Sequence, residues 1–187
     1  MIQGNGFLLR TVRASDVDAL YEARSNVEGR GEFIPPRMGS EPAFKKEFDE
    51  TGFWTDDSGV LLIIDSEDGR MLGQISYFRA VYYSDALEVG FQLFQAANRG
   101  KGIMTEVLRL FCSFLFSHRN LYRLQLAAHP DNVASRRVAE KAGFREEGVL
   151  RGSTFHRGAH HDVVLYSLLR DEWVPVPPFT PLESPPR

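Results

Sequence analysis

Three apolar runs follow one another in the middle of the chain, and they constrain the fold more than any other feature. The runs cover residues 59–65, 71–83 and 86–94, and short turns rich in Gly, Asp and Ser separate them. Runs of this length that carry β-branched and aromatic residues are typical of strands. Strands joined by tight turns pair antiparallel. The sequence therefore predicts an antiparallel meander at the centre of the fold.

A glycine-rich turn follows the meander directly and leads into a long apolar helix. Residues 98–102, NRGKG, hold two glycines and two cations, and the periodicity predicts a helix over about 103–116. The first amides of a helix lack internal partners and carry partial positive charge, so they attract anions. Glycines at this place let an anion approach without meeting a Cβ atom. The turn is therefore either a plain flexible connection or an anion site.

Other periodic segments surround this centre. They predict strands at 7–12 and 122–128, helices at about 15–26, from 41 onward and at 133–144, and a terminal hairpin of 146–156 with 160–169. Ser15 and Asn132 are placed as helix N-caps, and Gly143 as a C-terminal glycine. Residues 29–40 have the composition of a loop.

One domain accounts for most of the chain. Its 187 residues suffice for a single sizeable core, and residues 1–173 are expected to form it. From residue 174 onward the chain holds six of its ten prolines. The segment 174–187 is therefore expected to be a disordered or surface-draped tail.

Charge and cysteine content exclude several classes of protein. A formal net charge of -3 and a pI near 6.0 give no case for binding nucleic acid or membranes. The single cysteine, Cys112, excludes an internal disulfide and favours a reducing compartment. The first residues lack the apolar core of a signal peptide, and no apolar run approaches the ~20 residues of a membrane span. We expect a cytoplasmic protein.

Three segments in the second half of the chain occur in a characteristic order. They are ANRGKGIMTEVL (97–108), HPDNVASRRVAEKAGFREEGVLR (129–151) and RGAHHDVVLYSLLRDEW (157–173). Together they resemble the GCN5-related N-acetyltransferase (GNAT) family, and most closely its RimJ/RimL-type branch. The first is similar to the family's [QR]-x-x-G-x-[GA] loop, with Ala97 in place of the usual Gln or Arg. The others are similar to its N-x-x-S helix and its closing strand.

The resemblance implies a fold and an activity. The fold is mixed α/β, with a central, mostly antiparallel twisted sheet of about seven strands flanked by about four helices. The activity is transfer of acetyl from acetyl-CoA to a primary amine by direct attack, without a metal. The acceptor is a protein or peptide α-amine or a small-molecule amine, and homodimers are common in the branch. Two alternatives remain open: another donor such as succinyl-CoA, or a CoA-binding module without catalysis.

The resemblance also assigns roles to residues. Those of the pyrophosphate loop are Asn98, Arg99, Gly100, Lys101, Gly102 and Ile103. Backbone amides around Gln92, Leu93 and Phe94 bind the acetyl carbonyl. Asn132 contacts the pantetheine arm, and Ser135 donates a proton to the sulfur. A cation of the same helix contacts the nucleotide phosphate, with Arg137 assigned and Arg136 and Lys141 as alternatives.

The candidate residues for proton transfer and for acceptor binding each have a functional and a structural interpretation. Glu88, in the third strand of the meander, is the candidate base, because a half-buried carboxylate can accept a proton from an amine. It could equally be a glutamate on a polar strand face. Glu106, in the first turn of the following helix, is expected to be structural. Phe33 and Trp54 are candidates for the acceptor wall, or they fill the core.

The remaining reactive side chains have ordinary explanations. Cys112 lies among apolar helix positions, so we expect it in the core. Tyr166 is either a general acid or a core aromatic. His156, His160 and His161 flank one turn, but no cysteine or carboxylate completes a metal site. Alternation along a strand also sends the last two to opposite faces, so no metal is expected.

Overall fold

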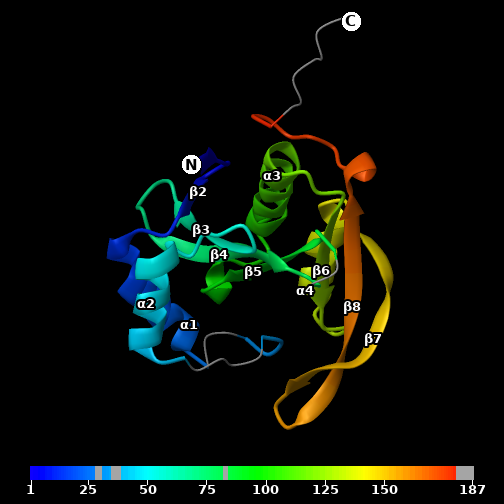
Figure 1. Ribbon diagram of the computed structural model, residues 1–187, viewed down its shortest axis with the longest axis horizontal. Coiled ribbons are helices and arrows are strands. Elements are labelled where there is room, and N and C mark those ends of the chain that lie inside the picture. The colour runs from blue at the N-terminus through cyan, green and yellow to red at the C-terminus, as the bar shows by residue number, and fades with distance from the viewer. Residues whose placement is uncertain (28–30, 35–38, 82–83, 180–187) are drawn as a thin grey trace, which may run out of the picture.

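The computed structural model describes residues 1–27, 31–34, 39–81 and 84–179 (Figure 1). Its strands are β1 (Ile2–Gln3), β2 (Phe7–Thr11), β3 (Ser58–Asp65), β4 (Met71–Arg79), β5 (Leu87–Leu93), β6 (Arg123–Ala128), β7 (Arg145–His156) and β8 (Ala159–Leu169). Its α-helices are α1 (Val17–Ser25), α2 (Glu41–Thr51), α3 (Ile103–His118) and α4 (Val133–Lys141). Short 3-10 turns occupy Ala14–Asp16, Ala96–Asn98 and Arg170–Glu172.

The strands form one sheet in the order β1-β2-β3-β4-β5-β6-β8-β7. Neighbours pair antiparallel except β5 and β6, which pair parallel. The predicted meander and the predicted mixed α/β fold are confirmed. Eight strands are present among the described residues, rather than about seven, because the two-residue strand β1 adds to the edge beside β2.

Helices cover both faces of the sheet (Figure 1). On one face, α3 and α4 pack over the larger core, which includes Ile75, Val89 and Phe111. On the other face, α1 and α2 pack over a smaller cluster around Leu20 and Leu62. Residues two apart along a strand share a face, so each core position of β4 and β5 can be assigned to the α3 side or to the α1–α2 side.

Two of the three predicted helix ends are confirmed. The Asn132 side-chain oxygen accepts a hydrogen bond from the Ser135 backbone N–H at 3.1 Å, and Gly143 has φ 97° after α4. The prediction that Ser15 caps the first helix is wrong. The chain enters α1 through the 3-10 turn Ala14–Asp16, in which the Asp16 carboxylate accepts from the Arg13 backbone N–H at 2.8 Å and from Arg10 at 2.6 Å.

Some predicted segments lie outside the described residues. They are loop residues 29–30 and 35–38, the end of the second predicted strand at 82–83, and the tail beyond 179. The described part of the tail runs along α3, where the Val176 N–H donates to the Ser113 hydroxyl at 3.3 Å and Phe179 lies edge-on to Phe114. Among the described helices, none is long and apolar enough to cross a membrane.

Candidate active site

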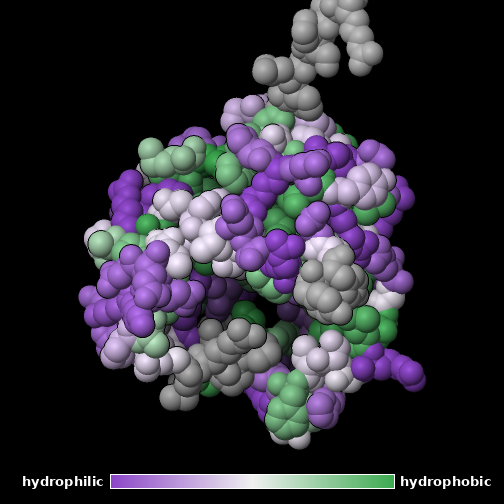
Figure 2. Space-filling view, in the orientation of Figure 1, coloured by the Kyte–Doolittle hydropathy of each residue, from purple (hydrophilic) through white to green (hydrophobic). Residues whose placement is uncertain are grey.

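Strands β5 and β6 hydrogen-bond at one end and separate at the other. Their ladder consists of two residue pairs, Leu87 with Leu124 and Glu88 with Gln125. Beyond these pairs the two strands diverge: β5 runs across the view, whereas β6 runs steeply down it (Figure 1). The space-filling view is hollowed between the end of β5 and the β6–α4 segment (Figure 2). The sheet is therefore open at the point where β5 leads into the glycine turn.

The opening exposes backbone groups of β5. The Phe94 N–H donates to the Leu72 carbonyl and the Ala80 N–H to the Ala86 carbonyl, both at 3.0 Å. Hydrogen-bonded pairs alternate along an antiparallel ladder, so Gln92 and Phe94 direct their amides toward β4. The amides of Val89, Phe91 and Leu93 point toward β6 instead. Of the three predicted acetyl-binding amides, the one at Leu93 therefore faces the gap.

The glycine turn presents a run of open amides. Gly100 and Gly102 have φ of 76° and 83°, and a Cβ at either position would have no described atom within 4 Å. No described residue accepts a hydrogen bond from the amides of residues 100–104, whereas those of Thr105 and Glu106 turn back to the Gly102 carbonyl. Successive amides with left-handed residues between them form an anion-binding concavity.

Two further features of this turn fit a bound phosphate. The Asn98 side-chain nitrogen is buried, and none of the described residues accepts a hydrogen bond from it, so this donor is available to a ligand. Arg99 and Lys101 are exposed beside the amides, and the N-terminus of α3 adds partial positive charge. Ile103 is the first residue of α3. The six residues predicted for the pyrophosphate loop therefore lie together, around open donors.

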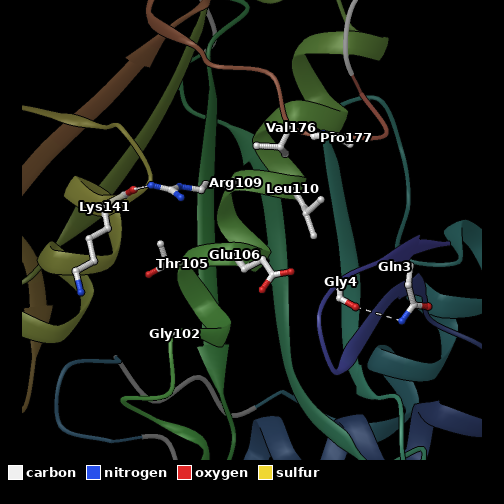
Figure 3. A pocket seen from close by; sticks show the side chains of 10 residues that line it. All are labelled: Gln3, Gly4, Gly102, Thr105, Glu106, Arg109, Leu110, Lys141, Val176 and Pro177. Atoms are coloured by element: carbon white, nitrogen blue, oxygen red, sulfur yellow. Dashed lines mark hydrogen bonds between the residues drawn. The ribbon is translucent and has the colours of Figure 1, made fainter.

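A groove of about 600 Å³ continues from this turn over the outer surface of α3 (Figure 3). It extends from Lys141 on one side to Gln3 and Gly4 on the other, and Gly102 lies at its lower end. Glu106 points into it and accepts a hydrogen bond from the Asn5 backbone N–H at 2.8 Å. That bond ties α3 to the chain between β1 and β2, as the structural interpretation of Glu106 predicts.

Helix α4 supplies the opposite wall of the gap. Because the Asn132 oxygen caps the helix, its amide nitrogen remains available, and among described residues nothing bonds it or the half-buried Ser135 hydroxyl. Arg136 is occupied, donating to the Tyr166 hydroxyl at 2.9 Å and to the Pro130 carbonyl at 3.1 Å. Its side chain is therefore committed to holding α4 in place.

The other two cations of α4 are free to bind a ligand. Arg137 is exposed, and Lys141 lies one turn further along the same helix. Within the described chain neither side-chain cation has an ion-pair partner. The Lys141 backbone carbonyl accepts a bond from Arg109 of α3, which fixes the end of α4 against α3. These two positions therefore remain the candidates for a phosphate contact.

Glu88 lies where the gap begins. Its carboxylate is half-buried on the face of the sheet away from α3, and one oxygen accepts from the Gln125 side-chain amide at 2.9 Å. The other oxygen has no hydrogen-bond partner among the described residues. The carboxylate is thus oriented by β6 while one oxygen stays open to a ligand.

The two predicted acceptor-wall residues have different positions. Phe33 is stacked on His129 with ring centroids 5.0 Å apart, directly after β6 and near the gap. Trp54 lies edge-on to Tyr77 at 5.3 Å and also contacts Phe114 of α3. Tyr77 is buried on the α3 side of the sheet, opposite to Glu88. The structure therefore brings Phe33 to the site, and it places Trp54 on the far side of the sheet.

Histidines join the loop of Phe33 to the terminal hairpin. His129 Nε2 lies 3.3 Å from His161 Nδ1, and His161 Nε2 lies 3.0 Å from the His156 carbonyl. His156 Nε2 lies 2.8 Å from the Glu32 carbonyl. His160 instead contacts Phe155, as strand alternation predicts. The described residues contain no group of three side chains suited to a metal.

Cys112 and Tyr166 belong to the core. Burial raises the pKa of the Cys112 thiol and that of the Tyr166 hydroxyl, and both side chains are buried. Among the residues around the gap, sequence analysis did not identify His129, Gln125, Phe78 or Gly90. Alternation from Glu88 could have identified Gly90, whereas the others required the pairing of separate strands.

A sheet that opens between two parallel strands, with a glycine turn at its end, defines the class to which the chain belongs. Residues 7–145 match the acetyltransferase (GNAT) domain family, and the chain is a member of it.

Several known proteins are similar to this chain. The Bacillus subtilis protein YdaF, provisionally named a ribosomal N-acetyltransferase, is 37% identical over 106 residues, which cover 57% of each chain. The solved ribosomal-protein-S5-alanine acetyltransferase of Vibrio fischeri superposes with a TM-score of 0.78 at 23% identity, over 93% of this chain and 98% of its own. The Vibrio cholerae spermidine N-acetyltransferase, solved with CoA and spermine, gives a TM-score of 0.76 at 18% identity over 90% and 98%. The match spans 57–61% of the length of the first curated relatives.

Proposed function

We propose that this chain transfers an acetyl group from acetyl-CoA to a primary amine, by direct attack of the amine and without a covalent acyl-enzyme. The observation that carries the proposal is the gap between β5 and β6, in which open strand amides lead to the open amides of residues 100–104. A slender ligand that bears amides along its length and a pyrophosphate at its end suits both parts. Membership of the GNAT family supports the same donor.

Each wall of the gap has a binding role in this proposal. Residues 98–103 bind the pyrophosphate through backbone amides and the Asn98 side chain. The Leu93 backbone N–H donates a hydrogen bond to the acetyl carbonyl oxygen. Asn132 donates from its free amide nitrogen to the pantetheine arm. Arg137, with Lys141 beside the groove, neutralises the nucleotide phosphate. The orphaned Asn98 nitrogen and the empty space at Gly100 and Gly102 support this assignment.

The chemistry needs two proton transfers. Acetyl-CoA supplies an already activated thioester, and holding both reactants in place lowers part of the remaining barrier. Glu88 accepts one proton from the protonated amine, which frees the nitrogen lone pair to attack the acetyl carbon. Ser135 donates a proton to the sulfur as the carbon–sulfur bond breaks. Placement of Glu88 at the start of the gap and of Ser135 on the opposite wall supports this division of roles.

The acceptor in this proposal is a protein or peptide α-amine or a small-molecule amine. The name of YdaF refers to a ribosomal acceptor, and that of the spermidine N-acetyltransferase refers to a small-molecule amine. Phe33 contributes the acceptor wall. The single cysteine, Cys112, supports a cytoplasmic site of action.

A donor and acceptor screen tests the proposal. The purified chain is incubated with acetyl-CoA and a panel of free-N-terminus peptides, polyamines and aminosugars, and both free thiol and acetylated product are measured. We expect acetylated product in equal amount to thiol for at least one class. Turnover with succinyl-CoA but not acetyl-CoA would replace the donor. CoA binding by calorimetry without turnover would indicate a binding module, and no CoA binding would overturn the proposal.

A further inference from the structure

Phe78 and Glu88 are partners in the ladder between β4 and β5. Residues directly opposite each other in an antiparallel pair share a face, and their Cβ atoms lie about 5 Å apart. Phe78 is 43% exposed, whereas its chain neighbour Tyr77, on the α3 face, is 1% exposed. A large aromatic ring therefore lies open to solvent beside the candidate base.

Gly90 leaves this face bare next to Glu88. Gly90 lies two residues after Glu88 on β5, so a side chain at this position would point to the same face of the sheet as Glu88. Among the described atoms, a Cβ there would meet only the Ser76 hydroxyl oxygen, at 3.4 Å, and that hydroxyl already donates to the Gly90 carbonyl at 3.3 Å. Glycine weakens a strand interior and is often found where a ligand approaches closely. The absent side chain opens a path from Glu88 to the gap.

No cation neutralises Glu88 among the described residues. Arg123, two residues before Gln125 on β6, pairs with Glu147 at 2.6 Å. Arg79 lies on the opposite, α3 face with Tyr77 and pairs with Asp57 at 2.6 Å. A carboxylate beside an aromatic face is the combination that attracts a positively charged ammonium group.

We propose that Phe78 and Glu88 together bind the acceptor's ammonium group, and that the absence of a side chain at Gly90 lets this group reach the acetyl donor in the gap. This inference rests on the proposed function and specifies its substrate as an unhindered primary ammonium. The ammonium ion lies over the Phe78 ring and donates a hydrogen bond to Glu88. It then transfers one proton to that carboxylate, and the neutral nitrogen attacks the acetyl carbon. As the carbon–sulfur bond breaks, Ser135 gives its proton to the sulfur and regains one from the second proton that the nitrogen releases. A peptide α-ammonium and the terminal ammonium of a linear amine share this chemistry.

Steady-state kinetics with a peptide and with a linear amine as acceptors test this ammonium-binding site. Wild type, Phe78→Leu and Phe78→Tyr are assayed with a short peptide that has a free N-terminus and with a linear polyamine. Phe155→Leu is the matched control, because Phe155 is 63% exposed on β7. We expect Phe78→Leu to raise KM for the amine about 3- to 10-fold, with KM for acetyl-CoA unchanged. Phe78→Tyr and Phe155→Leu should resemble wild type, and the acceptor that responds identifies the source.

Tetramethylammonium isolates the aromatic contribution without turnover. It has no N–H to donate to Glu88 and no nitrogen lone pair to acetylate. In saturation-transfer NMR we expect it to bind wild type and Phe78→Tyr but not Phe78→Leu, and to compete with the amine in active assays. Equal binding to all three proteins would overturn the inference even if acetyl transfer is observed. Failure of every protein to acetylate amines would instead refute the proposed function.

Gly90 substitutions provide a second test. Gly90→Ala and Gly90→Val should fold normally, because a Cβ at this position meets only the Ser76 hydroxyl oxygen among the described residues and β-branched residues suit strands. We expect wild-type melting temperature and CoA affinity, with kcat/KM for the amine reduced at least 10-fold in Gly90→Val. Unchanged kcat/KM in a folded Gly90→Val protein would show that the acceptor does not pass this face.

Discussion

The Gln125 side-chain amide donates to the Glu88 carboxylate at 2.9 Å across the last residue pair before β5 and β6 separate. One bond thus orients the candidate base at the point where the sheet opens. A residue on a strand has a rigid backbone, so its side chain can be aimed precisely by a single neighbour.

Replacement of Glu88 by Gln removes the proton acceptor but keeps the shape and the contact with Gln125. We expect kcat to fall 10²-fold or more, because a positioned base contributes about 10²–10⁴ in rate. CoA affinity should be unchanged by calorimetry. Glu106→Gln is the control, since Glu106 bonds the Asn5 amide and lies in the groove over α3. Equal kcat for wild type and Glu88→Gln would assign the base elsewhere.

Gly102→Ala tests the open amides. The residue has φ 83°, so alanine is strained there and its methyl group enters the space where a phosphate would lie. We expect CoA affinity to fall at least 10-fold in calorimetry. Gly69→Ala is matched for strain, with φ 75° and nothing within 4 Å of its Cβ, but it lies in the β3–β4 turn.

Both glycine variants should melt at a temperature lower by about 2–4 °C, as expected for about 1 kcal/mol in a chain of this size. The difference in CoA affinity between the two variants therefore measures the contribution of the glycine turn. A loss of CoA affinity in both, or in neither, would show that the effect does not come from the glycine turn.

Asn132→Ser separates the cap from the ligand contact. Serine can accept the Ser135 N–H and so preserve the cap, but it lacks the amide nitrogen that we assign to the pantetheine arm. We expect stability within about 0.5 kcal/mol of wild type and a several-fold higher KM for acetyl-CoA. Asn132→Ala should show the higher KM and also lose about 1 kcal/mol of unfolding free energy. Wild-type KM in the serine variant would leave Asn132 with a structural role alone.

Glu147 predicts a pH dependence of stability. Hydrogen bonds from Arg123, with two contacts at 2.6 Å, and from the Ser167 hydroxyl lower its pKa to about 2. A carboxyl whose pKa is depressed by folding stabilises the protein above its unfolded pKa of about 4.3 and loses that contribution as pH falls toward 2. The side chain is 39% exposed, so solvent screening limits the expected contribution to about 1 kcal/mol.

Urea unfolding of wild type and Glu147→Gln at several pH values between 7 and 2.5 measures this contribution. The two curves should differ at neutral pH and converge in acid. Glu67→Gln, at an exposed position in the β3–β4 turn, is the control. A constant difference between wild type and Glu147→Gln across the whole range would contradict the assignment.

The sequence by itself determined the features that depend on neighbours in the chain. Three apolar runs joined by tight turns predicted the meander, and the apolar stripe of α3 predicted its buried face. Asn132 was recognisable as a cap because capping involves an amide three residues away. The spacing of Gly100 and Gly102 before a helix predicted open amides because the first helical turn always leaves them unpaired.

Only the tertiary structure decided which residues meet across strands. The register between β4 and β5 places Phe78 beside Glu88, and the short β5–β6 ladder determines where the gap begins. Trp54 lies on the α3 face because its ring packs against Tyr77, which no local pattern indicates. A shift of one residue in strand pairing would reverse every such assignment. Register depends on packing between segments far apart in the chain, and a single sequence carries no direct record of it.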